Sequence, residues 1–203
     1  MHKIAIVDKM HKDGINLLKN NPKFECELIE DLSKENLMSK LPNFDGITLR
    51  RGKIDSEILE KCKNLKVISR HGVGYDNVDI KVLKKKKISL LVTGTTTSVS
   101  PAEHIMFMIL NISKGLNLYD NAVRNGKFEN IMHMKNNNTF ELANKKILII
   151  GFGRIGRKLI KRCLGFDLKV YIYDPFIDEK LTKSFGGVKI NDLNEGLKEA
   201  DII

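Results

Sequence analysis

Short apolar runs alternate with amphipathic stretches along the first 92 residues of the chain. The runs occupy residues 3–7, 24–29, 46–49, 66–69 and 88–92. Between them, the stretches around residues 15–18, 32–41, 58–62 and 78–83 carry apolar side chains at helical spacing. Strands that alternate with helices in this way form βαβ units on a parallel sheet. The pattern therefore predicts an α/β domain with a flavodoxin-like layout.

A second unit is predicted to begin at residue 99. The segment Ser100-Pro101-Ala102-Glu103 offers a serine N-cap, a proline at the first helical position and an acid in the first turn. Apolar residues at helical spacing follow, so we expect one long helix over about residues 101–124 that ends at Asn125-Gly126. The polar stretch 130–138 is predicted to be a loop.

One complete βαβ unit is predicted further along, with strands at 146–150 and 169–173 around a helix at 154–164. A strand at 188–190, a helix at 193–199 and the first residues of another strand at 201–203 follow. This second domain is predicted to be the first half of a doubly wound α/β domain, whose sheet would continue beyond Ile203. The pattern thus predicts two domains, residues 1–98 and 99–203.

The most specific motif in the chain is a G-x-G-x-x-G sequence between a predicted strand and a predicted helix, Gly151-Phe152-Gly153-Arg154-Ile155-Gly156. In such a loop Gly151 permits a tight turn, Gly153 lets the backbone approach a pyrophosphate, and Gly156 lets the helix pack close to the strand. The amides of Arg154 and Ile155 would face the phosphates at the positive end of the helix dipole. A plain strand-to-helix turn is the alternative interpretation.

An acid, Asp174, ends the next predicted strand, close to the spacing of about 20 residues expected of the acid that binds the adenosine ribose. A carboxylate at this place can accept both ribose hydroxyls and would repel a 2′-phosphate, which favours NAD over NADP. The loop and the acid together predict that residues 99–203 are the first half of a Rossmann NAD-binding domain. The alternative is that Asp174 only caps the next element. FAD-binding proteins share the fingerprint, so the loop and the acid alone leave both cofactors open.

Composition and charge narrow the kind of partner. The three cysteines, Cys26, Cys62 and Cys163, are far apart and odd in number, so we expect neither a disulfide framework nor a metal site. We therefore expect the protein to be cytoplasmic. The formal charge of +10 is spread along the chain, and its one block, Lys84–Lys87, is predicted to be a solvated helix end. With only 6% aromatic residues and no apolar stretch of membrane-spanning length, we expect no nucleic-acid or membrane partner.

Three ordered motifs bring the chain close to a known family. They are Ser69-Arg70-His71-Gly72-Val73-Gly74-Tyr75-Asp76-Asn77-Val78-Asp79, then Ser98-Val99-Ser100-Pro101-Ala102-Glu103-His104, and finally the glycine loop with Arg157, followed by Tyr173-Asp174-Pro175. With these motifs the chain resembles, essentially end to end, the NAD-dependent D-isomer-specific 2-hydroxyacid dehydrogenases, and among them the D-3-phosphoglycerate dehydrogenase and hydroxypyruvate reductase branch. The resemblance implies NAD as the cofactor and a small anionic 2-hydroxy or 2-keto acid as the substrate.

The resemblance also implies a domain arrangement and a substrate site. A substrate domain, residues 1–98, would close over the nucleotide domain, and the helix at 101–124 would link them and form a homodimer interface. Backbone N–H groups of the loop 70–75 would bind the substrate carboxylate, Val73 would touch the nicotinamide side, and Arg50 would help to hold the anion. The expected substrate-binding residues are Arg50, Arg70, His71, Gly72, Val73 and Gly74.

Each of these assignments has a structural alternative. Ordinary surface charge would explain Arg50, Arg51 and Arg70, because arginines at strand ends are common. A plain turn would explain Gly72 and Gly74.

Catalysis is the part of the family pattern that this chain does not match. Hydride transfer to a 2-keto acid needs a cation near the carbonyl and an acid/base group, usually a histidine. None of the five histidines, His2, His11, His71, His104 and His133, matches the family's catalytic position. The resemblance implies that the catalytic Arg, Glu and His lie beyond Ile203, so we expect the 203 residues alone to be inactive. The alternative function is a non-enzymatic NAD-binding sensor or corepressor of the same fold.

Overall fold

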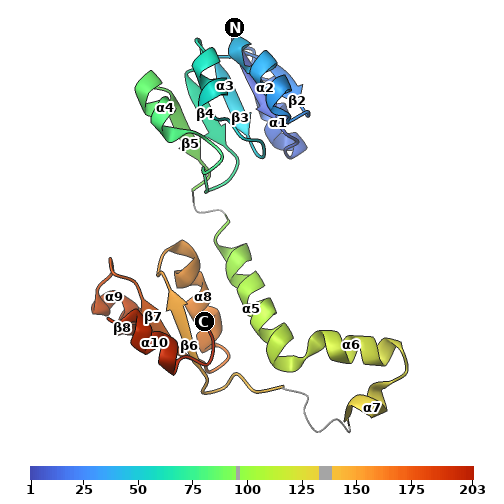
Figure 1. Ribbon diagram of the computed structural model, residues 1–203, viewed down its shortest axis with the longest axis vertical. Helices are drawn as coiled ribbons and strands as arrows, with labels where there is room; N and C mark the ends of the chain where they lie inside the picture. Colours follow the sequence, from blue (N-terminus) through green and yellow to red (C-terminus); the bar gives the residue numbers. More distant parts are fainter. Residues whose placement is uncertain (95–96, 133–138) are drawn as a thin grey trace. The chain divides into compact units, whose positions relative to one another are not determined.

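The computed structural model describes residues 1–94, 97–132 and 139–203, and the chain falls into two compact units (Figure 1). Unit 1 is Met1–Gly94 and unit 2 is Thr95–Ile203. The sequence placed this boundary four residues later, after residue 98.

Unit 1 is built on a five-stranded parallel sheet with the strand order β2-β1-β3-β4-β5. Its strands are β1 (His2–Val7), β2 (Phe24–Ile29), β3 (Gly46–Leu49), β4 (Val67–Arg70) and β5 (Ser89–Val92). This is the flavodoxin-like order. The predicted flavodoxin-like layout is therefore confirmed, and each strand lies within a residue or so of its predicted position.

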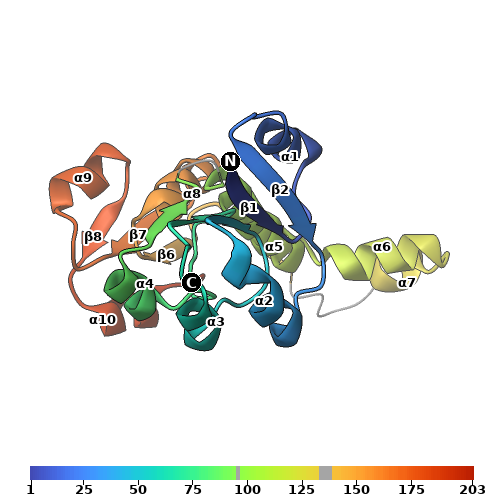
Figure 2. The same cartoon turned by 90° about the horizontal axis from the view of Figure 1, so that it is seen from above.

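Four α-helices connect these strands: α1 (Lys12–Lys19), α2 (Lys34–Lys40), which the short 3-10 helix η1 (Leu41–Asn43) extends, α3 (Ser56–Lys61) and α4 (Ile80–Lys86). Ser33, Asp55 and Asp79 begin the last three α-helices, because each side chain accepts a hydrogen bond from a first-turn amide. Figure 2 shows α2, α3 and α4 on one face of the sheet and α1 on the other. The core lies under the three helices, which bury Leu37, Ile58 and Leu83.

The prediction that the Lys84–Lys87 block is a solvated helix end is wrong for one of its residues, Lys86. Lys86 is only partly exposed, and its Nζ donates hydrogen bonds to the carbonyl oxygens of Leu59, Glu60 and Cys62 at 2.5, 3.0 and 3.3 Å. These oxygens belong to the carboxyl end of α3, where the last carbonyls lack intrahelical donors. The other three lysines of the block are exposed, as the sequence predicted.

Unit 2 holds a three-stranded parallel sheet, β6 (Lys146–Ile150), β7 (Lys169–Tyr173) and β8 (Val188–Ile190). Ile202 forms a parallel bridge to Ile147, and because β7 occupies one edge of β6, Ile202 lies along the other. The helices are α8 (Arg154–Leu164), α9 (Glu179–Ser184) and α10 (Leu193–Glu199). These elements match the prediction for residues 146–203 except for α9, a helix that the sequence analysis did not predict.

The prediction of one long helix over residues 101–124 is wrong, because the segment forms two helices. The chain forms α5 (Val99–Lys114), breaks at Gly115, and continues as α6 (Leu116–Arg124) at an angle to α5 (Figure 1). Gly115 adopts φ +62° and its amide bonds back to the carbonyls of Asn111 and Ile112, so it ends α5 as a glycine C-cap. The apolar periodicity runs on through the glycine and conceals the break.

Two further boundaries in this region also differ from the prediction. The N-cap of α5 is Ser98, not Ser100, and the helix begins at Val99. The start of the predicted 130–138 loop belongs to α7 (Phe128–Met132), whereas residues 133–138, with His133, lie outside the described residues. Asn125 and Gly126 end α6 as predicted, and Gly126 has φ +64°.

Candidate functional site

The glycine loop of unit 2 joins β6 to α8, and its three glycines have different backbone conformations and surroundings. Gly151 adopts φ +90°, and its amide donates to the carbonyl of Tyr173 at 2.8 Å. A Cβ atom on Gly156 would lie 2.5 Å from the carbonyl oxygen of Gly151, so only glycine allows this close approach of helix and loop. A Cβ atom on Gly153 would meet no atom within 4 Å. Gly151 and Gly156 thus serve the fold, whereas Gly153 faces open space.

The start of α8 presents an anion-binding geometry. Gly153 is its N-cap residue and makes no side-chain cap, so Arg154 and Ile155 form the exposed first turn. First-turn amides have no intrahelical acceptor, and together with the helix dipole they attract phosphate. The buried ring of Phe152 anchors the loop from below, with the guanidinium of Arg157 5.8 Å from the ring centre. The loop therefore fits a pyrophosphate in front of Gly153.

The carboxylate of Asp174, directly after β7, is bonded to this loop. Its Oδ2 accepts from the amide of Phe152 at 2.8 Å, and its Oδ1 accepts from the amide of Phe176 at 2.9 Å. These backbone hydrogen bonds hold the pKa of Asp174 below its usual value, so it carries a negative charge at neutral pH. Each oxygen keeps a second lone pair, so the carboxylate can still accept from ribose hydroxyls.

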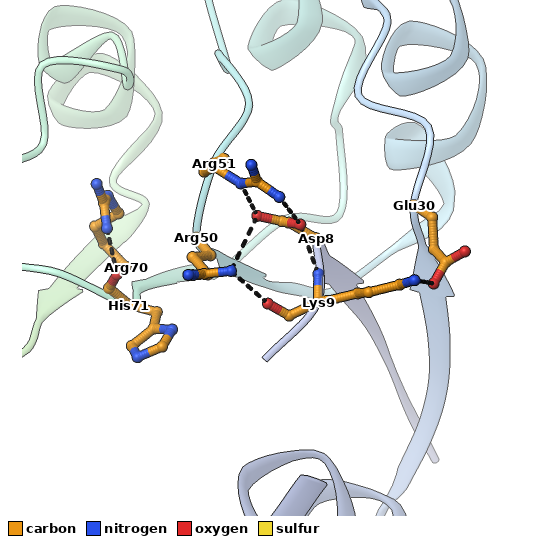
Figure 3. Close-up of polar contacts among 7 residues, drawn as sticks. All are labelled: Asp8, Lys9, Glu30, Arg50, Arg51, Arg70 and His71. Atoms are coloured by element: carbon orange, nitrogen blue, oxygen red, sulfur yellow. Dashed lines mark hydrogen bonds and ion pairs between the residues drawn. The ribbon is translucent and has the colours of Figure 1, made fainter. Parts of the chain in front are cut away.

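In unit 1, charged groups gather where β1, β3 and β4 end (Figure 3). Arg50 follows β3, is about half-exposed, and donates from Nη1 to the carbonyl of Lys9 at 3.3 Å. The same Nη1 lies 4.0 Å from Oδ2 of Asp8. Arg50 is thus held beside the carboxyl end of β1 with part of its guanidinium in solvent.

Arg51 and Asp8 form a bidentate pair that the sequence interpretation missed. Arg51 Nε donates to Asp8 Oδ2 at 2.7 Å, and its Nη2 donates to Oδ1 at 3.1 Å. These hydrogen bonds lower the pKa of Asp8 from 3.8 to about 2. An available signal was the acid directly after the first predicted strand, because neighbouring parallel strands end at the same edge of a sheet.

The loop 70–75 uses part of its own polar groups internally. Arg70 donates from Nη1 to the carbonyl of His71 and from Nε to Asn77 Oδ1 at 3.3 Å. The amide of His71 donates to the carbonyl of Leu49, and that of Gly72 donates to the carbonyl of Arg70. Arg70 therefore braces its own loop, and its predicted contact with substrate stays a prediction.

Three amides of the loop remain available to a ligand. Within the part of the chain that the structure describes, the amides of Val73, Gly74 and Tyr75 donate to no protein acceptor. They are therefore the loop's open backbone donors.

The other histidines in the described ranges have local contacts. His11 caps α1 by accepting from the amide of Asp13, and His104 stacks on Phe107 with ring centres 5.8 Å apart. Among the described residues no three His, Cys, Asp or Glu side chains are grouped as metal ligands. Nor does any helix in the described ranges have the length and apolarity to cross a bilayer.

A parallel sheet whose first loop is G-x-G-x-x-G, with an acid after the second strand, defines a dinucleotide-binding α/β protein. Two family models match the chain. The catalytic domain of the D-isomer specific 2-hydroxyacid dehydrogenases matches residues 4–148, and the NAD binding domain of the same family matches residues 106–203. The chain belongs to the D-isomer specific 2-hydroxyacid dehydrogenase family, and its cofactor is NAD.

Individual relatives agree with this assignment. D-3-phosphoglycerate dehydrogenase of Methanocaldococcus jannaschii is 33% identical over all of this chain and 38% of its own length. Hydroxypyruvate reductase of Thermotoga maritima is 33% identical over all of this chain and 63% of its own length. D-lactate dehydrogenase of Aquifex aeolicus, solved with NAD and lactic acid, is 28% identical with a TM-score of 0.83 over 98% of this chain and 58% of its own. The chain thus spans less than two thirds of each relative.

Proposed function

We propose that this chain supplies the NAD site and part of the substrate site of a D-2-hydroxyacid dehydrogenase. The observation that carries the proposal is the hydrogen bond between Asp174 and Phe152, which holds the ribose-binding acid against the pyrophosphate loop. In this family bound NAD would accept a hydride from the alcohol carbon of the substrate, or NADH would donate a hydride to the ketone carbon. Residues Gly151, Gly153, Arg154, Ile155 and Gly156 would bind the pyrophosphate, and Val73 would contact the nicotinamide side.

The substrate class follows from the charge at the carboxyl edge of unit 1. We propose a 2-hydroxy acid that resembles 3-phosphoglycerate, glycerate or hydroxypyruvate, in line with the names of two relatives. The open amides of Val73 and Gly74 would bind its carboxylate, with His71 and Gly72 shaping the loop around them. Arg50 would hold the anionic end, because a half-exposed guanidinium can bind a carboxylate with two parallel hydrogen bonds.

The acid/base group and the catalytic cation are proposed to come from the length of the relatives that this chain does not span. Among the described residues, no contact of His71 or His104 orients its ring for the role of acid/base group. We therefore propose that the 203 residues bind NAD weakly and do not turn over substrate. The three free cysteines fit our further proposal that the protein works in the cytoplasm.

The experiment compares two forms of the protein with NADH and either hydroxypyruvate or phosphohydroxypyruvate. One form is the 203-residue chain, and the other is a longer form that covers the remaining length of the relatives. We expect turnover only in the longer form. Equal activity in the short form would refute the proposal and would make His71 or His104 a candidate proton donor. NAD binding without turnover in the longer form would favour the sensor or corepressor.

The helices α5 and α6 are proposed to form a homodimer interface. Their exposed large apolar side chains include Phe107, Ile112, Leu116 and Val123, and a surface of this kind favours burial against another protein. Analytical ultracentrifugation of the longer form should show a dimer, and Ile112→Asp should weaken it. Leu17→Asp, at an equally exposed leucine of α1, is the matched control and should leave the mass unchanged.

A further inference from the structure

Asp8 has a conformation and an environment that its place after a strand does not require. It adopts φ +75°, in the left-handed region that non-glycine residues seldom occupy. Its side chain is almost fully buried, and its own Oδ1 accepts from the amide of Lys9 at 2.7 Å. Strained backbone at a buried charge persists only where its surroundings hold it, and such positions cluster at functional sites.

The carboxylate of Asp8 organises two guanidinium groups. Arg51 binds it through two parallel hydrogen bonds, and Arg50 approaches the same Oδ2 to 4.0 Å while it bonds to the carbonyl of Lys9 (Figure 3). The ammonium of Lys9 is turned to Glu30, 3.3 Å away, and so does not compete for Asp8. Adjacent arginines would repel each other without the carboxylate between them.

Geometry matters more for Arg50 than charge alone. A planar guanidinium binds a carboxylate or phosphate best when its fork is presented in the plane of the anion. Within the described residues Arg50 donates one hydrogen bond, to the carbonyl of Lys9, so its orientation depends on the neighbouring negative charge. Arg51 binds both carboxylate oxygens of Asp8 and so fixes where they lie.

We propose that Asp8 is a positioning residue for substrate: braced by Arg51, its carboxylate holds the guanidinium of Arg50 in the orientation that binds the anionic end of the 2-hydroxy acid. This inference rests on the substrate site proposed above. It assigns a function to Asp8 and Arg51 that the family motifs do not include.

The test is a double-mutant cycle in the longer, active form of the protein. Asp8→Asn should raise KM for hydroxypyruvate about tenfold and leave kcat within about twofold, because the residue acts on binding through Arg50. In an Arg50→Ala background, Asp8→Asn should raise KM no further, because the group that it positions is gone. Arg51→Gln, which removes the charge of an exposed side chain, should behave like Asp8→Asn.

The matched control is Asp45→Asn. Asp45 lies just before β3, at the opposite end of the strands from Asp8, and like Asp8 it accepts from a backbone amide, here that of Lys3 at 2.9 Å. Its loss should lower stability without changing KM. Asp8→Glu should restore part of the affinity, because it returns the charge.

The outcomes separate the two proposals. If Arg50→Ala leaves KM unchanged, the proposed substrate site itself is wrong. If Arg50→Ala raises KM but Asp8→Asn and Arg51→Gln do not, the positioning role is wrong and the substrate site stands. Additive effects in the cycle would also overturn the positioning role, since Asp8 and Arg51 would then act independently of Arg50. Should Asp8→Asn fail to fold, the cycle of Arg51→Gln with Arg50→Ala decides by the same criteria.

Discussion

The amide of Phe152 and the carboxylate of Asp174 are joined by a 2.8 Å hydrogen bond, so the glycine loop and the acid proposed to bind the ribose form one unit. They lie at the ends of neighbouring parallel strands, β6 and β7. A change at Asp174 should therefore affect both the proposed ribose contact and the position of the loop.

Replacing Asp174 by Ala should weaken NADH binding by about tenfold or more and narrow the preference for NADH over NADPH. The variant loses the acceptor for the ribose hydroxyls and the charge that repels a 2′-phosphate. Titration calorimetry with both cofactors measures the two constants. Asp174→Asn keeps one acceptor oxygen without the charge, so it should narrow the preference with a smaller loss of affinity. An unchanged ratio of the two constants in both variants would contradict the assignment of Asp174.

Gly153→Ala and Gly156→Ala should have opposite effects on binding and stability. The Cβ atom of Gly153→Ala enters open space, so the melting temperature should change little while NAD affinity falls, because the methyl group occupies the place of the pyrophosphate. The Cβ atom of Gly156→Ala would lie 2.5 Å from the backbone oxygen of Gly151, which should cost about 1–3 kcal/mol of stability. Thermal unfolding with and without NAD distinguishes the two. Full NAD affinity in Gly153→Ala would mean that the phosphates bind elsewhere.

Asp8 should make the stability of unit 1 depend on pH in acid. Its pKa is lowered from 3.8 to about 2 on folding, so its stabilising contribution is complete above about pH 4 and is lost as the pH falls towards 2. The contribution is on the order of 2 kcal/mol at neutral pH. Urea unfolding, followed through the amide signals of β1 and β3, should show a gap between wild type and Asp8→Asn that closes between about pH 4 and pH 2. A gap that stays constant over this range would show that Asp8 is not the titrating group.

Lys86→Met should destabilise unit 1 by about 1–2 kcal/mol, because the carbonyls of Leu59, Glu60 and Cys62 at the end of α3 lose the hydrogen bonds from Lys86, and within the described residues Leu59 keeps only that from the amide of Cys62. The control is Lys85→Met, which removes the same charge from the same helix at an exposed site with one ion pair to Glu60. It should change stability by less than about 0.5 kcal/mol. Equal effects of the two variants would mean that only net charge, and not the contact with α3, matters.

The sequence by itself determined the features whose signals are local. Strand and helix periodicity placed nearly every element, because the burial of one face repeats along the chain within each element. The glycine loop and Asp174 were also readable, since a strand, a tight turn, a helix and a second strand follow one another at nearly constant spacing. The αL break at Gly115 was local too, but the apolar pattern that continues through it obscured the signal.

Only the tertiary structure decided which polar groups are used up by the fold and which remain for a ligand. Asp8 meets Arg51, and Lys86 meets the end of α3, across sequence separations that carry no periodic signal. Arg70 turns back into its own loop and Arg51 is paired with Asp8, whereas the half-exposed Arg50 keeps part of its guanidinium in solvent. The reason is physical: a hydrogen bond between side chains far apart in sequence depends on distances of a few tenths of an ångström, and the packing of strands and helices sets those distances.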